Sequence, residues 1–218
     1  SVVVAMTAVG STPLHKAIAW TQNSRLGNGG ASHRTGDGGR FVDHGHHALI
    51  RLDAFRDVGG YDESFSHNED AELDLRLARA GRRIWLTTRT GLNYVPRRTL
   101  KALWRQYFRF GSGRARTVLK HRITPRIRQM IPIAVAPAIA LLALAPLHPA
   151  FALPATLWVL ACLAGGAALA IANREALAVA MGPVAGTMHA AWSAGFWYRL
   201  LTAPFARRDA VPPALSAG

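Results

Sequence analysis

The stretch Gly59-Gly60-Tyr61-Asp62-Glu63-Ser64-Phe65 is followed by Asn68-Glu69-Asp70-Ala71-Glu72-Leu73-Asp74-Leu75. Acidic residues fill the first turn of the second stretch, Leu73 and Leu77 repeat at a spacing of four, and arginines crowd its end. Acids at the start and bases at the end match the helix dipole, and Gly81 suits the position just after a helix. The pattern therefore predicts a helix from Asn68 to about Gly81, entered through a glycine turn.

Strands and helices are expected to alternate around this helix. Strands are predicted at residues 2–6, 41–51, 84–86 and 92–95, helices at residues 13–22 and 100–110, and an exposed glycine-rich loop at residues 27–39. Asp53 is expected to cap a short helical turn that ends at Gly59-Gly60. The order indicates an α/β fold.

Charge is distributed unevenly along the 218 residues, whose formal net charge is +14. Between Met130 and Ala194 only Arg174 and Glu175 are charged, and a dense basic run precedes this apolar part. Basic residues beside an apolar segment are typical of the cytoplasmic side of a membrane protein. We therefore expect contacts with a membrane surface and with phosphorylated substrates, no nucleic-acid binding, and a domain boundary between residues 1–124 and 125–218.

The apolar part contains segments long enough to cross a bilayer. Helices are predicted at about residues 130–147 and 151–172, each of the length that a hydrocarbon core of roughly 30 Å requires. A third segment, residues 176–194, either crosses or remains re-entrant or interfacial. Cys162 is the only cysteine, so the sequence has no disulfide framework and no cysteine-based metal site.

The order of the glycine turn, the Glu69-Asp70 pair and Arg79-Ala80-Gly81 resembles the second half of family 2 glycosyltransferases, in particular membrane-anchored enzymes of exopolysaccharide biosynthesis. The resemblance implies part of a GT-A domain followed by transmembrane helices. It also implies that Asp70 is the general base of an inverting transfer and that Glu69 helps to position the acceptor.

General acid–base chemistry agrees with this assignment. An acceptor hydroxyl must lose its proton as it attacks the anomeric carbon, and a carboxylate can accept that proton. Taken without the preceding turn, the acids at positions 69, 70 and 72 are explained better as favourable residues of a first helical turn. Their spacing behind the G-G-Y-D-E turn favours the catalytic interpretation of Asp70.

A second motif, Gln106-Tyr107-Phe108-Arg109-Phe110, resembles the Q-x-x-R-W motif of membrane-embedded family 2 enzymes. The resemblance implies that Gln106, Arg109 and Phe110 bind the donor diphosphate and the acceptor sugar, with Phe110 in place of the tryptophan. An arginine can neutralise a departing diphosphate. The alternative is that Arg109 only extends its charged group to the bilayer surface.

The run Asp43-His44-Gly45-His46-His47 contains three histidines. On a strand, His44 and His46 face one side and the remaining residues face the other, so at most two imidazoles and no carboxylate converge locally. The sequence therefore predicts no metal site here. In the resembling family this strand passes under the cleft, which makes His44 and His46 candidate substrate-binding residues.

The resembling family binds its donor through an N-terminal α/β half and a divalent metal through a D-x-D motif, and this sequence contains no D-x-D. The resemblance implies that the chain begins just beyond that motif. It also implies that the intact enzyme uses Mg²⁺ or Mn²⁺ through residues that are not in this chain, and that the chain alone is inactive.

Together these features predict a multi-pass protein of the inner (plasma) membrane with its catalytic part in the cytoplasm. It is expected to transfer a sugar from a nucleotide-sugar donor to a lipid-linked or polysaccharide acceptor. The alternative is a catalytically inactive scaffold subunit of a polysaccharide assembly system.

Overall fold

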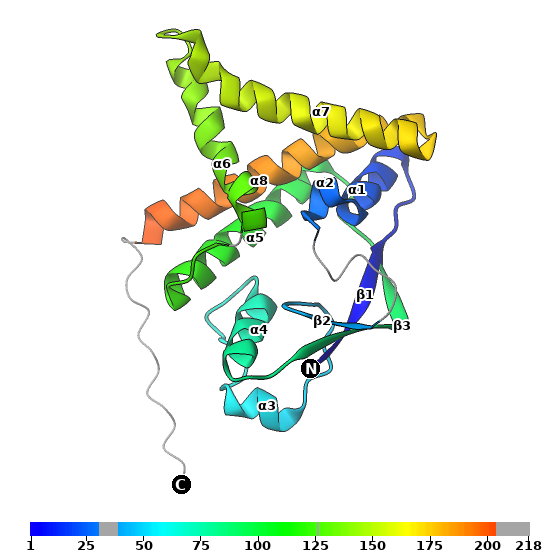
Figure 1. Ribbon diagram of the computed structural model, residues 1–218, viewed down its shortest axis with the longest axis vertical. Helices are drawn as coiled ribbons and strands as arrows, with labels where there is room; N and C mark the ends of the chain where they lie inside the picture. Colours follow the sequence, from blue (N-terminus) through cyan, green and yellow to red (C-terminus); the bar gives the residue numbers. More distant parts are fainter. Residues whose placement is uncertain (31–38, 126, 204–218) are drawn as a thin grey trace.

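The computed structural model describes residues 1–30, 39–125 and 127–203, and combines a small sheet with a larger number of helices (Figure 1). The strands are β1 (Val2–Ala8), β2 (Arg40–Val42) and β3 (Ile84–Tyr94). The α-helices are α1 (Pro13–Asn23), α2 (Arg25–Asn28), α3 (Leu52–Asp57), α4 (Glu69–Arg79), α5 (Leu100–His121), α6 (Ile127–Leu141), α7 (Leu153–Asn173) and α8 (Met181–Thr202). Short 3-10 helices are η2 (Leu142–Leu144), η3 (Pro149–Ala152) and η4 (Ala176–Ala180).

The sheet has the strand order β1-β3-β2, with β1 parallel and β2 antiparallel to the central strand β3. The segments predicted as two strands at residues 84–86 and 92–95 are the two ends of β3. The register between β1 and β3 shifts after Val4, which pairs with Thr87 while Ala5 pairs with Gly91. Val3, Ile84 and Leu86 are buried together and form the core of the sheet. This mixed α/β arrangement fits a GT-A-like domain.

The strand predicted at residues 41–51 is wrong over most of its length. Only residues 40–42 pair with β3, and Leu49 makes an isolated bridge to Val2. The chain bends between them because Gly45 lies directly on the Val3 side chain, where a Cβ atom would overlap it, and because His47 has a φ of 53°. The bend places His44 and His46 against α4.

Two further local predictions need correction. The N-cap of α3 is Arg51, and Asp53 instead lies in the first turn, where it accepts hydrogen bonds from the Arg51 guanidinium. Within the segment predicted as a glycine-rich loop, Gly27 belongs to the short helix α2, while residues 31–38 lie outside the described part of the chain.

The predicted helix after the glycine turn is confirmed as α4. Asn68 is its N-cap, with a φ of 62°, and Gly81 follows its end with a φ of 72°, a conformation that glycine adopts without strain. Leu73 and Leu77 are buried against Ala54 of α3. The period of four that predicted the helix is therefore the period of its buried face.

The amphipathic helix predicted at residues 100–110 continues to His121 as α5 and lies alongside α8 (Figure 1). The two backbones touch at reciprocal glycines. A Cβ atom on Gly111 of α5 would overlap the Trp192 carbonyl oxygen, and one on Gly195 of α8 would overlap the Phe108 carbonyl oxygen. The amphipathic face of α5 is thus partly covered by α8.

Within the described residues, one helical stretch, Pro149–Asn173, is long and apolar enough to cross a membrane, judged by length and composition. Only 17% of its most apolar window is buried inside the chain, which distinguishes it from a typical core helix. The first predicted span is shorter than expected, because α6 ends at Leu141 and contains Pro132 and Pro137. Additional spans and the division at residue 124 stay predictions.

The glycine contact between α5 and α8 yields a test with a control on the same helix. Gly195→Ala should lower the free energy of unfolding by about 1–3 kcal/mol, because the new methyl group is forced into the α5 backbone. Gly186→Ala should be neutral or stabilising by up to about 1 kcal/mol, since its Cβ would meet only the Trp158 ring at 3.8 Å and alanine favours helix. Denaturant unfolding in detergent measures both; equal effects would contradict the close contact.

Candidate functional site

The proposed base, Asp70, lies in the first turn of α4 and faces the histidines that follow β2. The distance from His46 Nδ1 to Asp70 Oδ2 is 2.6 Å, and the backbone N–H of Ala71 donates to Asp70 Oδ1 at 2.7 Å. The side chain of Asp70 keeps 32% of its surface exposed. The carboxylate is therefore paired but is not sealed from solvent.

Opposing effects act on the pKa of Asp70. Burial would raise it, but the hydrogen bond with His46 and the electrostatic attraction of the His44 and His46 rings lower it to about 2. Asp70 is accordingly ionised at neutral pH, which is the state required of a proton acceptor.

A second histidine–carboxylate pair lies beside the first. His44 Nδ1 is 2.7 Å from Asp74 Oδ2, the Asp74 side chain is buried, and the rings of His44 and His46 pack edge to face with centroids 4.7 Å apart. The sequence prediction that no carboxylate joins these histidines holds only locally along the chain. Asp70 and Asp74 reach them from α4, 24 and 30 residues further along the chain.

Ligand atoms of His44, His46 and Asp70 all lie within 4.8 Å of one another, so the cluster could hold a cation. Two imidazoles and one carboxylate suit Zn²⁺ and related transition metals, whereas Mg²⁺ prefers an all-oxygen set, so these residues do not fit the Mg²⁺ that the resemblance implies. The Asp74 carboxylate would fix the tautomer of His44 with the lone pair on Nε2. Ligand atoms around such an ion lie roughly 3–3.5 Å apart, so the His46–Asp70 pair would have to open slightly.

A cavity of about 490 Å³ connects this cluster with the apolar helices. His44, His46, Asn68 and Ala71 belong to its lining, so the histidines and residues flanking Asp70 form part of its wall, whereas Asp70 itself is not among the lining residues. The lining also includes apolar residues of α6, α7 and α8, which are Ile131, Pro132, Trp158, Ala161, Cys162, Met188 and Trp192. Polar residues of the same lining include Arg25, Asn28, Arg114, Gln129 and His189. The indole nitrogen of Trp158 is buried and has no hydrogen-bond partner among the described residues. The cavity thus combines the histidines beside Asp70 with a largely apolar lining from the C-terminal helices.

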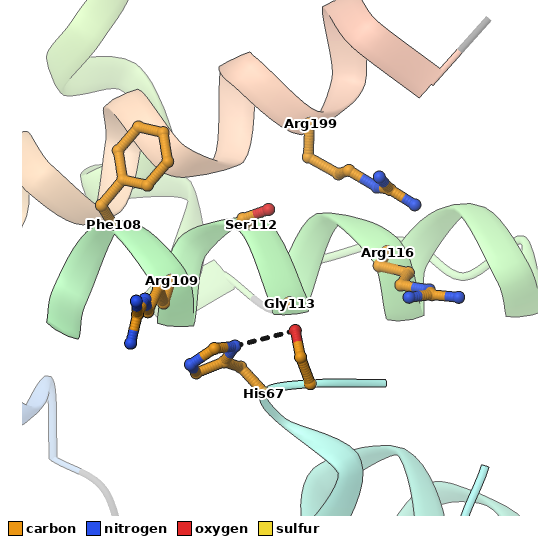
Figure 2. A pocket seen from close by; sticks show the side chains of 8 residues that line it. His67, Phe108, Arg109, Ser112, Gly113, Arg116 and Arg199 are labelled. Atoms are coloured by element: carbon orange, nitrogen blue, oxygen red, sulfur yellow. Dashed lines mark hydrogen bonds between the residues drawn. The ribbon is translucent and has the colours of Figure 1, made fainter. Parts of the chain in front are cut away.

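The structure separates the residues of the Q-x-x-R motif. Phe110 lines the large cavity, Gln106 donates from Nε2 to the Tyr94 hydroxyl at 2.9 Å, and Arg109 lines a second cavity on the other face of α5 (Figure 2). Glu69 is half-buried at the first position of α4, next to Asp70. The binding roles of these residues stay predictions.

Sequence reasoning missed the group that fixes α4 in place. Glu72 is fully buried, and its carboxylate contacts Arg76 at 2.6 Å, Lys120 at 2.6 Å and His121 at 2.7 Å. Burial would raise the pKa of Glu72, but these three partners lower it to about 2. The spacing of four to Arg76 was visible in the sequence. No local pattern points to residues 48 and 49 positions further along the chain.

Comparison with known proteins agrees with the fold and the motifs. The family model described as Glycosyl transferase family group 2 matches residues 20–171, and the chain belongs to this family. The chain is 52% identical over 210 residues to the succinoglycan biosynthesis protein ExoA of Rhizobium meliloti (strain 1021). That match covers 96% of this chain and 63% of the relative, so the chain spans less than two thirds of the relative's length. No solved structure gives a significant match.

The Glu72 cluster predicts a specific acid sensitivity. The pKa values of Glu72 and Asp62, which share Lys120, are about 2 in the folded chain, against about 4 for unperturbed carboxyls. Depressed folded-state values stabilise the fold above pH about 4 and lose that contribution as the pH falls towards about 2. The free energy of unfolding, measured by urea denaturation, should therefore decline across this range.

Variants separate this cluster from general acid effects. Glu72→Gln should cost about 3 kcal/mol at neutral pH, because it leaves Arg76 and Lys120 without the buried carboxylate that they share, and should flatten the acid dependence. Asp57→Asn, which removes an exposed pair with Arg82, should retain the slope of the parent protein. An unchanged slope in the Glu72 variant would contradict the assignment.

Proposed function

We propose that this chain forms the acceptor-side part and the membrane anchor of an inverting glycosyltransferase. It would transfer a sugar from a nucleotide-sugar donor to a lipid-linked or polysaccharide acceptor in exopolysaccharide biosynthesis. The observation that carries the proposal is the cavity lined both by His44 and His46, of which His46 pairs with Asp70, and by apolar residues of α6, α7 and α8.

In this mechanism Asp70 accepts the proton of the acceptor hydroxyl while that oxygen attacks the anomeric carbon. The bond from the anomeric carbon to the donor diphosphate breaks in the same step, and the configuration inverts. A pKa of about 2 makes the carboxylate a weak base in the resting state. Proton transfer is nevertheless feasible, because the hydroxyl becomes strongly acidic as its oxygen forms the new bond.

The neighbouring residues would prepare this step. The hydrogen bond between His46 and Asp70 Oδ2 holds the carboxylate ionised and fixes its orientation. Asp74, in turn, orients His44. Glu69 and Phe110 would contact the acceptor sugar, and Gln106 the diphosphate or the acceptor. Arg109 lines the cavity on the opposite face of α5 and is not assigned to this step.

The shape of the cavity favours a lipid-linked acceptor over a free polysaccharide. Its apolar lining offers little to a polysaccharide, whereas a lipid chain gains about 25 cal/mol for each Å² of apolar surface that it buries. The stretch Pro149–Asn173, which contributes to the lining, would place the apolar side of the cavity within the bilayer. We therefore assign the protein to the inner membrane, with α4 on the cytoplasmic side and with further spans in the apolar part.

The donor-binding half is proposed to lie outside these residues, so the chain alone should not turn over. In the intact enzyme a divalent Mg²⁺ or Mn²⁺ ion would neutralise the diphosphate of the donor. The residues of this chain would bind and orient the acceptor and remove its proton.

The assignment of Asp70 is tested in a chain extended by the donor-binding half. Asp70→Asn should lower the turnover number by about 10²–10⁴-fold, because the amide retains the shape of the carboxylate but cannot accept the proton. Asp57→Asn, on the exposed face of α3, serves as the control and should transfer sugar like the parent enzyme. Near-parental turnover of the Asp70 variant in a donor-consumption assay would refute the base role.

A competing role for Asp70, as a cation ligand together with His44 and His46, needs a separate measurement because one carboxylate cannot serve both roles at once. Titration with Co²⁺ gives visible absorption bands when the ion is bound by the protein. Bands that Asp70→Asn and His44→Ala both abolish would identify a cation site. The base assignment predicts none at stoichiometric Co²⁺.

A further inference from the structure

A second cavity, of about 250 Å³, lies on the face of α5 opposite the large cavity. It is lined by the side chains of Arg109, Arg116, Arg199 and His67 and by Ser66 and Ser112 (Figure 2). Helical spacing explains the separation, since positions 109, 112 and 116 share one face of α5 whereas positions 107, 110 and 114 share the other. In the view of Figure 2, the turn that carries His67 lies below α5, and α8 with Arg199 lies above it.

The charge in this cavity is one-sided. None of the residues that line it within the described chain is acidic. Burial and the charge of Arg109 lower the pKa of His67, against the opposing effect of Glu69 nearby. The lining therefore has a positive potential, and a neutral His67 can still donate or accept a hydrogen bond.

The arginines are held in different ways. Arg116 is fixed by hydrogen bonds to Ser64, including one to its Oγ at 2.7 Å, and its guanidinium lies 4.4 Å from the centre of the Phe65 ring. Arg199 reaches from α8 towards α5 (Figure 2), and its Nε is buried without a hydrogen-bond partner among the described residues. A buried donor of this kind is costly unless a ligand accepts its hydrogen bond.

We propose that this cavity binds a phosphate group, held by Arg109 and Arg199, with Arg116, His67 and the two serine hydroxyls as further contacts. Guanidinium groups match phosphate oxygens with paired N–H donors. Three of them would offset the negative charge of a phosphate, and no acidic residue lines the cavity within the described chain. The site is distinct from the candidate transfer site and does not depend on the transfer reaction.

The surroundings favour a lipid headgroup as the source of the phosphate. Arg199 lies in the last turn of α8 beside Trp197 and Tyr198, and the side chain of Tyr198 is exposed. Aromatic and basic residues at the end of an apolar helix are typical of the level at which headgroups lie. A soluble diphosphate offers the same phosphate oxygens, so an experiment must distinguish it from the lipid headgroup.

Calorimetric titration of the 218-residue chain in mild detergent tests the proposal with three probes. Dioctanoyl phosphatidylglycerol represents the lipid phosphate, inorganic pyrophosphate the soluble one, and dioctanoylglycerol is the lipid without phosphate. We expect phosphatidylglycerol to bind and dioctanoylglycerol not to bind. Arg109→Gln and Arg199→Gln should each weaken binding about tenfold, as expected for a lost charge-assisted hydrogen bond.

Arg105→Gln is the matched control, because it removes one exposed positive charge from the same helix outside the cavity. It should change the affinity by less than about twofold. Binding of pyrophosphate alone, with the same dependence on Arg109 and Arg199, would identify a soluble phosphate as the ligand and would still support the site. Equal loss in Arg105→Gln, equal binding of dioctanoylglycerol, or no binding of either phosphate would overturn it. Asp70→Asn should bind like the parent, which separates this site from the transfer reaction.

Discussion

The buried carboxylate of Glu72 determines where the rest of the candidate site lies. It joins α4 to the C-terminal end of α5 through Lys120 and His121, and Lys120 also binds Asp62 of the glycine turn. A buried carboxylate without these partners would be strongly unfavourable, so the contacts stabilise α4 in the observed position. That position places the first turn of α4, with Asp70, against the bend that carries the histidines.

The contact between α5 and α8 links the joined helices α4 and α5 to the apolar helices. Because two glycines let the backbones touch, α5 and α8 form a closely packed pair, and both helices contribute residues to each of the two cavities. One cavity joins the Asp70 cluster to an apolar lining, and the other collects arginines. The same helix pair therefore supports a reaction site and, as we infer, a phosphate site on opposite faces.

The sequence predicted those parts of the fold that local patterns determine. The charges and leucines of α4, the strand β1 and the ends of β3 followed from residues within a few positions of one another. The family, and with it the proposed role of Asp70 as a base, followed from the spacing of motifs. These features share one property, which is that each is encoded in a continuous stretch of chain.

Features that depend on distant contacts could not be predicted in this way. The expected strand at residues 41–51 bends because Gly45 lies on Val3, a contact across 42 positions. Strand alternation placed two histidines on one face but could not supply Asp70 and Asp74 from α4. The motif around Gln106 and Arg109 suggested a single binding site, whereas the helical turn places Arg109 and Phe110 in different cavities.

A single displacement, assisted by the Asp70 carboxylate, is proposed to join donor and acceptor. Proton NMR of the anomeric signal of the first product, formed by an enzyme that contains this chain and its donor-binding half, tests it most directly. A single displacement gives a product whose anomeric configuration is opposite to that of the donor sugar. Retention of the donor configuration would require a different mechanism and would contradict the role given to this site.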